Sequence, residues 1–136
     1  MNIGEIIWPT PASAACKHYL RFMLLVVDEL GITFENDPPP DPLPVARAYL
    51  AGEISEQEYE RPRDAWWSNV EAAGGVTEFG NAAVLKARLA ICLLGALEET
   101  VEYIGDKLSW FLEVLEMMSY DGKRLSALMN AYFAPK

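Results

Sequence analysis

LAICLLGAL, residues Leu89–Leu97, runs through the middle of the chain without a single charged side chain. We predict that it lies within one long helix over Ala82–Ile104, with Asn81 as the N-cap and Gly105 just beyond the last turn. A helix that is apolar nearly all the way round has to be packed on several sides. The stretch therefore predicts a central helix with the other helices arranged around it.

Helix start and stop signals punctuate the rest of the chain, and the alternation typical of strands is nearly absent. Thr10 followed by Pro11 predicts the N-cap and first residue of a helix that ends before Gly31. With 136 residues and 51% hydrophobic residues, the chain is expected to form one helical domain over residues 1–136. The pattern predicts an all-α fold, an irregular antiparallel bundle of five to six helices. The remaining helices are expected over Leu43–Ala51, Glu56–Ala73, Lys107–Ser119 and Lys123–Phe133.

An acidic stretch, GEISEQEYERPRDAWW over Gly52–Trp67, carries the clearest local signal. Ser55 and Glu58 have the spacing of a capping box, which predicts a helix start. Pro62 falls in the second turn of that helix, where it removes a backbone hydrogen bond and predicts a kink or a break.

Trp66 and Trp67 close this stretch and lie about 100° apart on a helix, so they cannot both face the same core. Trp66 shares a stripe with small and apolar residues and is expected in the core. Trp67 has two interpretations: it caps a groove between helices, or it is an exposed anchor for a partner.

The net charge of −9 is unevenly distributed. Between Asp28 and Glu60 the only basic residue is Arg47, and between Glu98 and Asp121 it is Lys107. Such a balance opposes nucleic-acid binding and suits a basic protein partner. No apolar run approaches the ~20 residues needed to cross a bilayer, and the N-terminus does not resemble a signal peptide. We therefore expect a cytoplasmic protein that does not bind a membrane.

Residues typical of catalysis are scarce. The single histidine, His18, has no identifiable nucleophile to act on and is expected at the surface or the edge of the fold. Cys16 and Cys92 lie within apolar helical patterns and are expected to be buried free thiols. We expect no metal and no cofactor.

Clustered carboxylates give the one pattern that points to an enzyme. EETVE and EVLE resemble the EExxE…ExxD motif of MazG-like all-α nucleotide pyrophosphohydrolases, although Glu116 stands where that family has Asp. The resemblance implies a magnesium site, because carboxylates on adjacent helices bind this ion. The residues of this alternative are Glu98, Glu99, Glu102, Glu113 and Glu116.

Another alternative concerns the helix that contains WFLEVLEMM. Trp110, Val114 and Met117 form a second apolar stripe beside that of Phe111 and Leu115. The helix therefore lies between two neighbours, or it leaves one stripe for a second copy of the chain in a structural homodimer.

PVARAYLAGEISEQEYERPRDAWWSNVEAAGG and AAVLKARLAICLLGALEET, within Pro44–Thr100, resemble a family of all-helical immunity proteins of bacterial polymorphic toxin systems. The resemblance implies a non-enzymatic, antitoxin-like protein that binds a cognate toxin. Our leading hypothesis is that an acidic helical surface blocks the active site of that toxin. The residues predicted to contact it are Glu53, Glu56, Glu58, Glu60, Arg63 and Trp67.

Overall fold

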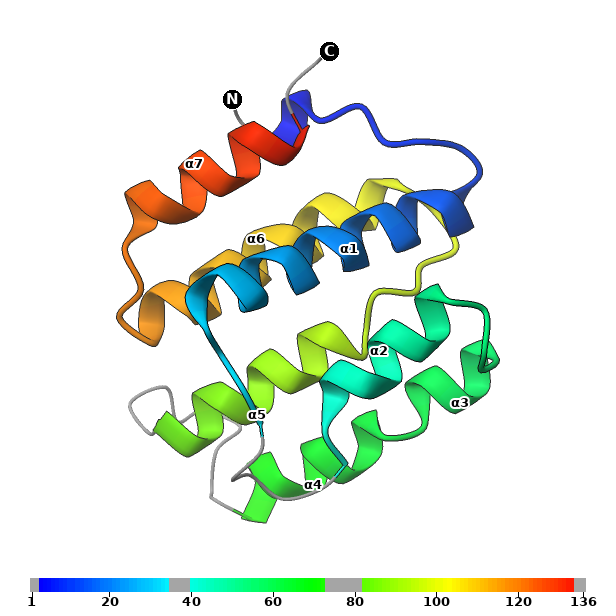
Figure 1. The fold of residues 1–136 in the computed structure, drawn as a ribbon, viewed down its shortest axis with the longest axis vertical. Coiled ribbons are helices and arrows are strands. Elements are labelled where there is room, and N and C mark those ends of the chain that lie inside the picture. The colour runs from blue at the N-terminus through cyan, green and yellow to red at the C-terminus, as the bar shows by residue number, and fades with distance from the viewer. Residues whose placement is uncertain (1–2, 35–39, 73–81, 134–136) are drawn as a thin grey trace.

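The computed structural model describes residues 3–34, 40–72 and 82–133, and the regular elements in these ranges are all helical (Figure 1). The predicted all-α bundle is therefore confirmed. None of the described helices is long and apolar enough to cross a membrane. The elements are η1 (Ile3–Glu5), α1 (Ala12–Leu30), α2 (Pro42–Leu50), α3 (Glu56–Glu60), α4 (Arg63–Ala72), α5 (Ala82–Leu93), α6 (Glu102–Met117) and α7 (Gly122–Phe133).

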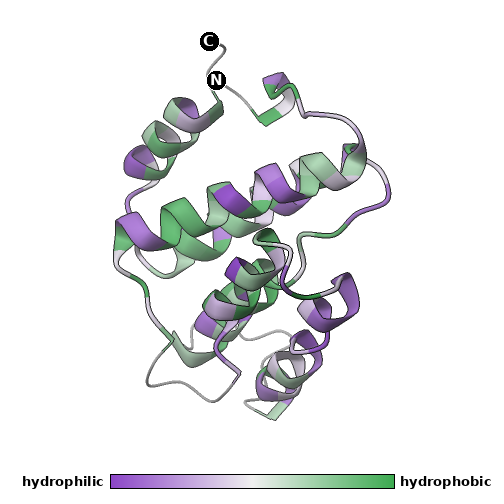
Figure 2. Ribbon diagram, turned by 45° about the vertical axis from the view of Figure 1, so that its right-hand side comes forward, coloured by the Kyte–Doolittle hydropathy of each residue, from purple (hydrophilic) through white to green (hydrophobic). Residues whose placement is uncertain are grey.

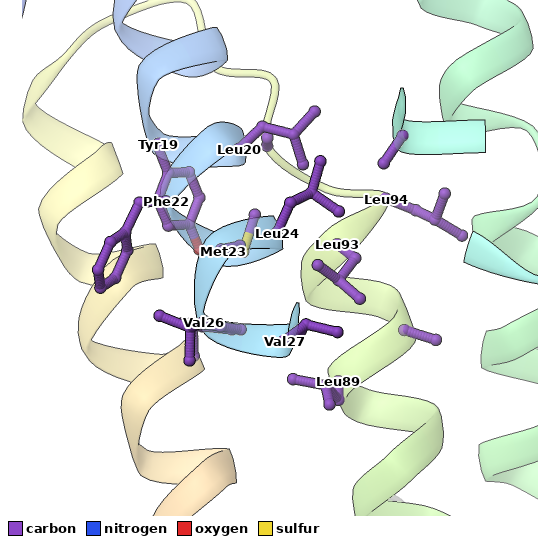
Figure 3. Close-up of a cluster of buried hydrophobic side chains, with 14 of the residues drawn as sticks. Tyr19, Leu20, Phe22, Met23, Leu24, Val26, Val27, Leu89, Leu93 and Leu94 are labelled. Carbon is purple, nitrogen blue, oxygen red and sulfur yellow. The ribbon is translucent and has the colours of Figure 1, made fainter. Parts of the chain in front are cut away.

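Helix α5 is central, as the apolar stretch predicts. It packs against α1, α2, α4 and α6, and Leu89 and Leu93 are fully buried. Figure 3 shows Leu24 and Val27 of α1 pointing toward these leucines. Hydrophilic residues are dense along α3 and the start of α4, whereas α1 and α5 carry long hydrophobic stretches (Figure 2).

Local signals place most helix ends correctly. The capping box at Ser55 is present, and Pro62 separates α3 from α4. The predicted cap of α1 at Thr10 is wrong, because Pro11 occupies the N-cap and no side chain caps the helix. Asn81, the predicted cap of the central helix, lies outside the described residues.

The predicted long helix over Ala82–Ile104 is wrong. Helix α5 ends at Leu93, and α6 begins at Glu102 and includes Gly105. The reason is a set of side chains that bind the backbone between the two helices. The hydroxyl of the fully buried Tyr59 donates to the Leu93 carbonyl at 2.6 Å and accepts from the Ala96 N–H at 3.1 Å.

Lys107 of α6 also binds the backbone of the segment between α5 and α6. Its ammonium donates to the carbonyls of Gly95 at 2.7 Å and Leu97 at 2.9 Å. Cys16 of α1 contacts the backbone of Glu98, whose N–H donates to the sulfur at 3.2 Å. Buried backbone groups need partners, and here side chains from three other elements replace the bonds of a continuing helix.

We expect Tyr59→Phe to destabilise the protein by about 1–3 kcal/mol, because it leaves the Leu93 carbonyl and the Ala96 N–H without their shared partner. Chemical denaturation followed by circular dichroism measures this loss. Tyr103→Phe is the matched control, since Tyr103 is 54% exposed and should lose almost nothing. Equal stabilities of the two variants would contradict the role given to Tyr59.

Ser119 ends α6 with a positive φ of 76°, a conformation that glycine adopts without a Cβ penalty. Its N–H donates to the Glu116 carbonyl at 2.9 Å, and the Tyr120 N–H donates to the Leu115 carbonyl at 3.1 Å. Ser119→Gly should therefore stabilise the fold by about 0.5–1 kcal/mol. Ser126→Gly, at an exposed position inside α7, should instead destabilise it by about 1 kcal/mol. Thermal melting distinguishes the two, and a loss with Ser119→Gly would refute the assignment.

His18 joins α1 to α7 at the half-buried edge of the fold. The Tyr132 hydroxyl donates to the His18 carbonyl at 3.1 Å, and the rings of Trp8 and Phe133 pack edge-on against the imidazole. Burial, and then the nearby Arg21, lower the pKa of His18 below its usual 6.5. The unfolded chain therefore binds more protons than the folded one once the pH falls below that value.

Stability should consequently fall as the pH is lowered through 6.5 toward the folded-state pKa of His18. In the His18→Gln variant, the loss of folding stability that comes from the protonation of His18 should disappear. Denaturant unfolding at about pH 7.5 and about pH 5.5, a window above most carboxylate titrations, measures the difference. An identical loss of stability in the variant and the wild-type protein would show that other groups cause it.

Candidate binding cleft

Helices α4, α5 and α6 surround a cleft of about 330 Å³. Trp67 of α4 and Trp110 of α6 line it together with Ile91 and Cys92 of α5. The size and the largely apolar lining are typical of sites that bind small molecules.

Arg63 and Trp67 both line the cleft because they lie one helical turn apart on α4. Arg63 pairs with Glu60, with 3.1 Å between Nη2 and the carboxylate oxygen. Its Nη1 lies beside Gly95, where an added Cβ would be 3.4 Å from that nitrogen and only 2.9 Å from the Ile91 carbonyl oxygen. The contact with the Ile91 carbonyl is what favours glycine at position 95, where the chain leaves α5.

Arg88 is the charged residue of this region that sequence reasoning missed. It is only 7% exposed, and its guanidinium carbon lies 5.8 Å from the ring centre of Trp67 and 5.9 Å from that of Trp110. These cation–π contacts hold two tryptophans from different helices against one cation. The available signal was a lone arginine just before the apolar stretch of the central helix.

Trp67 lies over a groove between helices, which is the first interpretation of its sequence position; its role as an anchor for a partner stays a prediction. It covers the groove between α4 and α5 through its contact with Arg88, and it remains 38% exposed at the cleft. Trp66, in contrast, is buried as predicted and donates its indole N–H to the Pro40 carbonyl at 2.8 Å.

Both cysteines are free thiols, as predicted, and Cys16 is buried. The expectation that Cys92 is buried as well is wrong in part, because its residue keeps some exposure at the cleft. Burial raises the pKa of Cys92 to about 12, and burial also raises the pKa of Cys16. Both therefore carry their proton at neutral pH, and a protonated thiol is a poor nucleophile. Cys92 contributes apolar surface to the cleft.

The six residues predicted to contact a partner separate into two groups. Arg63 and Trp67 line the cleft, and Glu60 joins them through its ion pair with Arg63. The others do not line the cleft: they are Glu53, Glu56 and Glu58, which are exposed on the turn before α3 and on its first helical turn. Glu60 and Arg63 form an ion pair with each other. The contact of the six residues with a partner stays a prediction.

The carboxylates of the hydrolase alternative are not assembled as the motif requires. Glu98 and Glu99 lie in the connection before α6, so they do not share a helical turn with Glu102. Glu98 is bound to Lys107 at 3.1 Å, while Glu113 and Glu116 are exposed on α6. Among residues 3–34, 40–72 and 82–133, no three His, Cys, Asp or Glu side chains are grouped to hold a metal ion.

The stripe proposed for a homodimer is also not one exposed surface. Val114 is fully buried, because α6 packs against α1, α5 and α7. Trp110 lines the cleft, and Met117 is 36% exposed. Of this stripe, Val114 packs between neighbouring helices, whereas Trp110 and Met117 remain partly exposed, and the homodimer stays a prediction.

Comparison of the chain with protein-family models, with curated proteins and with solved structures found no match. The cleft and the carboxylates of α3 are therefore interpreted from their own geometry and charge.

Proposed function

We propose that this protein binds a basic protein partner, a cognate bacterial toxin, in the cytoplasm and covers its active site without catalysing a reaction. The observation that supports this proposal is the pair of exposed carboxylates of Glu53 and Glu56. Neither forms an ion pair with any of the described residues. Two unneutralised charges so close along the chain are suited to a cationic surface.

The backbone that carries these carboxylates is held by several hydrogen bonds. Gly52 has a φ of 76°, which lets its N–H donate to the Tyr49 carbonyl at 3.0 Å while the Glu53 N–H donates to the Ala48 carbonyl at 2.9 Å. At the start of α3, the Ser55 hydroxyl accepts from the Glu58 N–H at 3.1 Å. A surface that is ordered before binding loses less conformational entropy when a partner arrives.

Charge and aromatic surface would act at different stages of binding. Exposed carboxylates steer a basic partner and raise its association rate, most strongly at low salt. The exposed part of Trp67 offers an aromatic contact, and tryptophan is enriched among residues that dominate interface energies. The resemblance of Pro44–Thr100 to toxin immunity proteins points in the same direction, since that segment contains both features.

The proposal is tested with the toxin encoded next to this gene, by co-expression and by measuring association rates. Glu53→Lys combined with Glu56→Lys should slow association by about tenfold at low salt and flatten its salt dependence. Glu58 is left unchanged because its carboxylate caps α3.

Glu113→Lys combined with Glu116→Lys is the matched control, with the same change in net charge at exposed positions of α6. It should slow association much less. If both double variants slow association equally, net charge rather than the α3 surface is responsible. If the wild-type protein neither binds nor neutralises the neighbouring toxin, the proposal fails.

A further inference from the structure

The residues that line the cleft carry more positive than negative charge, whereas the protein as a whole is acidic. Of the chain's eleven lysines and arginines, Arg63, Arg88 and Lys107 line it, and Asp106 is the one acidic residue among the lining side chains of the described chain. An overall charge of −9 makes such a concentration of cations at one apolar cleft unexpected.

These three cations differ in how far their hydrogen-bond donors are used. The Lys107 ammonium has three donors and three acceptors, namely the Gly95 and Leu97 carbonyls and the Glu98 carboxylate. Arg88 is buried against the two tryptophans. Arg63 has five donors, of which one nitrogen, Nη2, binds Glu60.

The remaining donors of Arg63 are placed to bind a ligand. Within the described chain, Nη1 and Nε of Arg63 make no hydrogen bond, and the side chain remains about one third exposed. Nη1 lies next to Gly95, which also lines the cleft. A planar guanidinium with a free edge binds carboxylate, sulfonate and phosphate groups through paired hydrogen bonds.

We propose that the cleft binds a small aromatic anion. Its ring system packs against Trp110 and Ile91, and its negatively charged group binds the free edge of Arg63. The volume of about 330 Å³ is at the lower end of ligand sites, which fits a molecule of one or two fused rings. The tryptophans supply flat apolar surface, and this is why the ligand is aromatic rather than a bare anion.

The test uses two dyes with the same ring system: anilinonaphthalene sulfonate, which is an anion, and anilinonaphthalene, which lacks the charged group. Titrations of the folded protein are followed by dye fluorescence. The wild-type protein should bind one sulfonate dye and should bind the uncharged dye about tenfold more weakly. Millimolar inorganic sulfate should not displace the dye, because it lacks the rings.

Variants locate the site. Arg63→Gln should weaken binding of the sulfonate dye by about tenfold and leave binding of the uncharged dye unchanged. Trp110→Leu should weaken binding of both dyes by about fivefold or more. Arg61→Gln is the matched control: Arg61 is exposed, does not line the cleft and should have no effect on either dye. Circular dichroism establishes that each variant is folded.

Several results would overturn the inference. Equal affinity of the wild-type protein for the two dyes would exclude recognition of the anion. Equal losses in Arg63→Gln and Arg61→Gln would show a general charge effect, and unchanged binding in both Arg63→Gln and Trp110→Leu would place the dye elsewhere. No toxin is used, so these results leave the proposal for the α3 carboxylates untouched.

Discussion

The hydroxyl of Tyr59 is the contact on which the arrangement of the helices depends. It lies between the Leu93 carbonyl and the Ala96 N–H, at the point where the central helix stops. Together with Lys107, it supplies the hydrogen bonds that a continuing helix would have made. The chain can therefore leave α5, cross to the other side of the core and return as α6, which packs against α5. Without that reversal, Trp110 could not face the helix that carries Arg88.

The same reversal brings three cations together. Several acidic side chains are exposed on the turn before α3, on its first helical turn and along α6. Arg63, Arg88 and Lys107 gather where α4, α5 and α6 meet. Arg63 forms an ion pair with Glu60, Arg88 packs against aromatic rings, and Lys107 binds two backbone carbonyls and the Glu98 carboxylate. The result is an acidic protein with a cation-lined apolar cleft.

Helix α4 and the segment before it link the two proposed binding surfaces. The exposed carboxylates belong to the turn before α3 and its first helical turn, and the cleft begins at Arg63 one short helix later. Pro62 stands between them and keeps α3 and α4 separate. The ion pair of Glu60 with Arg63 spans this junction, so part of the acidic segment belongs to the cleft rather than to the exposed surface.

By itself the sequence determined the all-α class, the central position of the apolar stretch, the capping box at Ser55 and the break at Pro62. These signals act within a few residues, since a cap or a proline changes only the hydrogen bonds of its own helical turn. Tertiary structure decided where α5 ends, because the groups that end it come from Tyr59 and Lys107, far from Leu93 in one direction and on the next helix in the other. It also decided the contacts of Arg88, since its ring partners lie on two other helices. Helical periodicity describes the face of a single helix, whereas the cleft exists only where three helices meet.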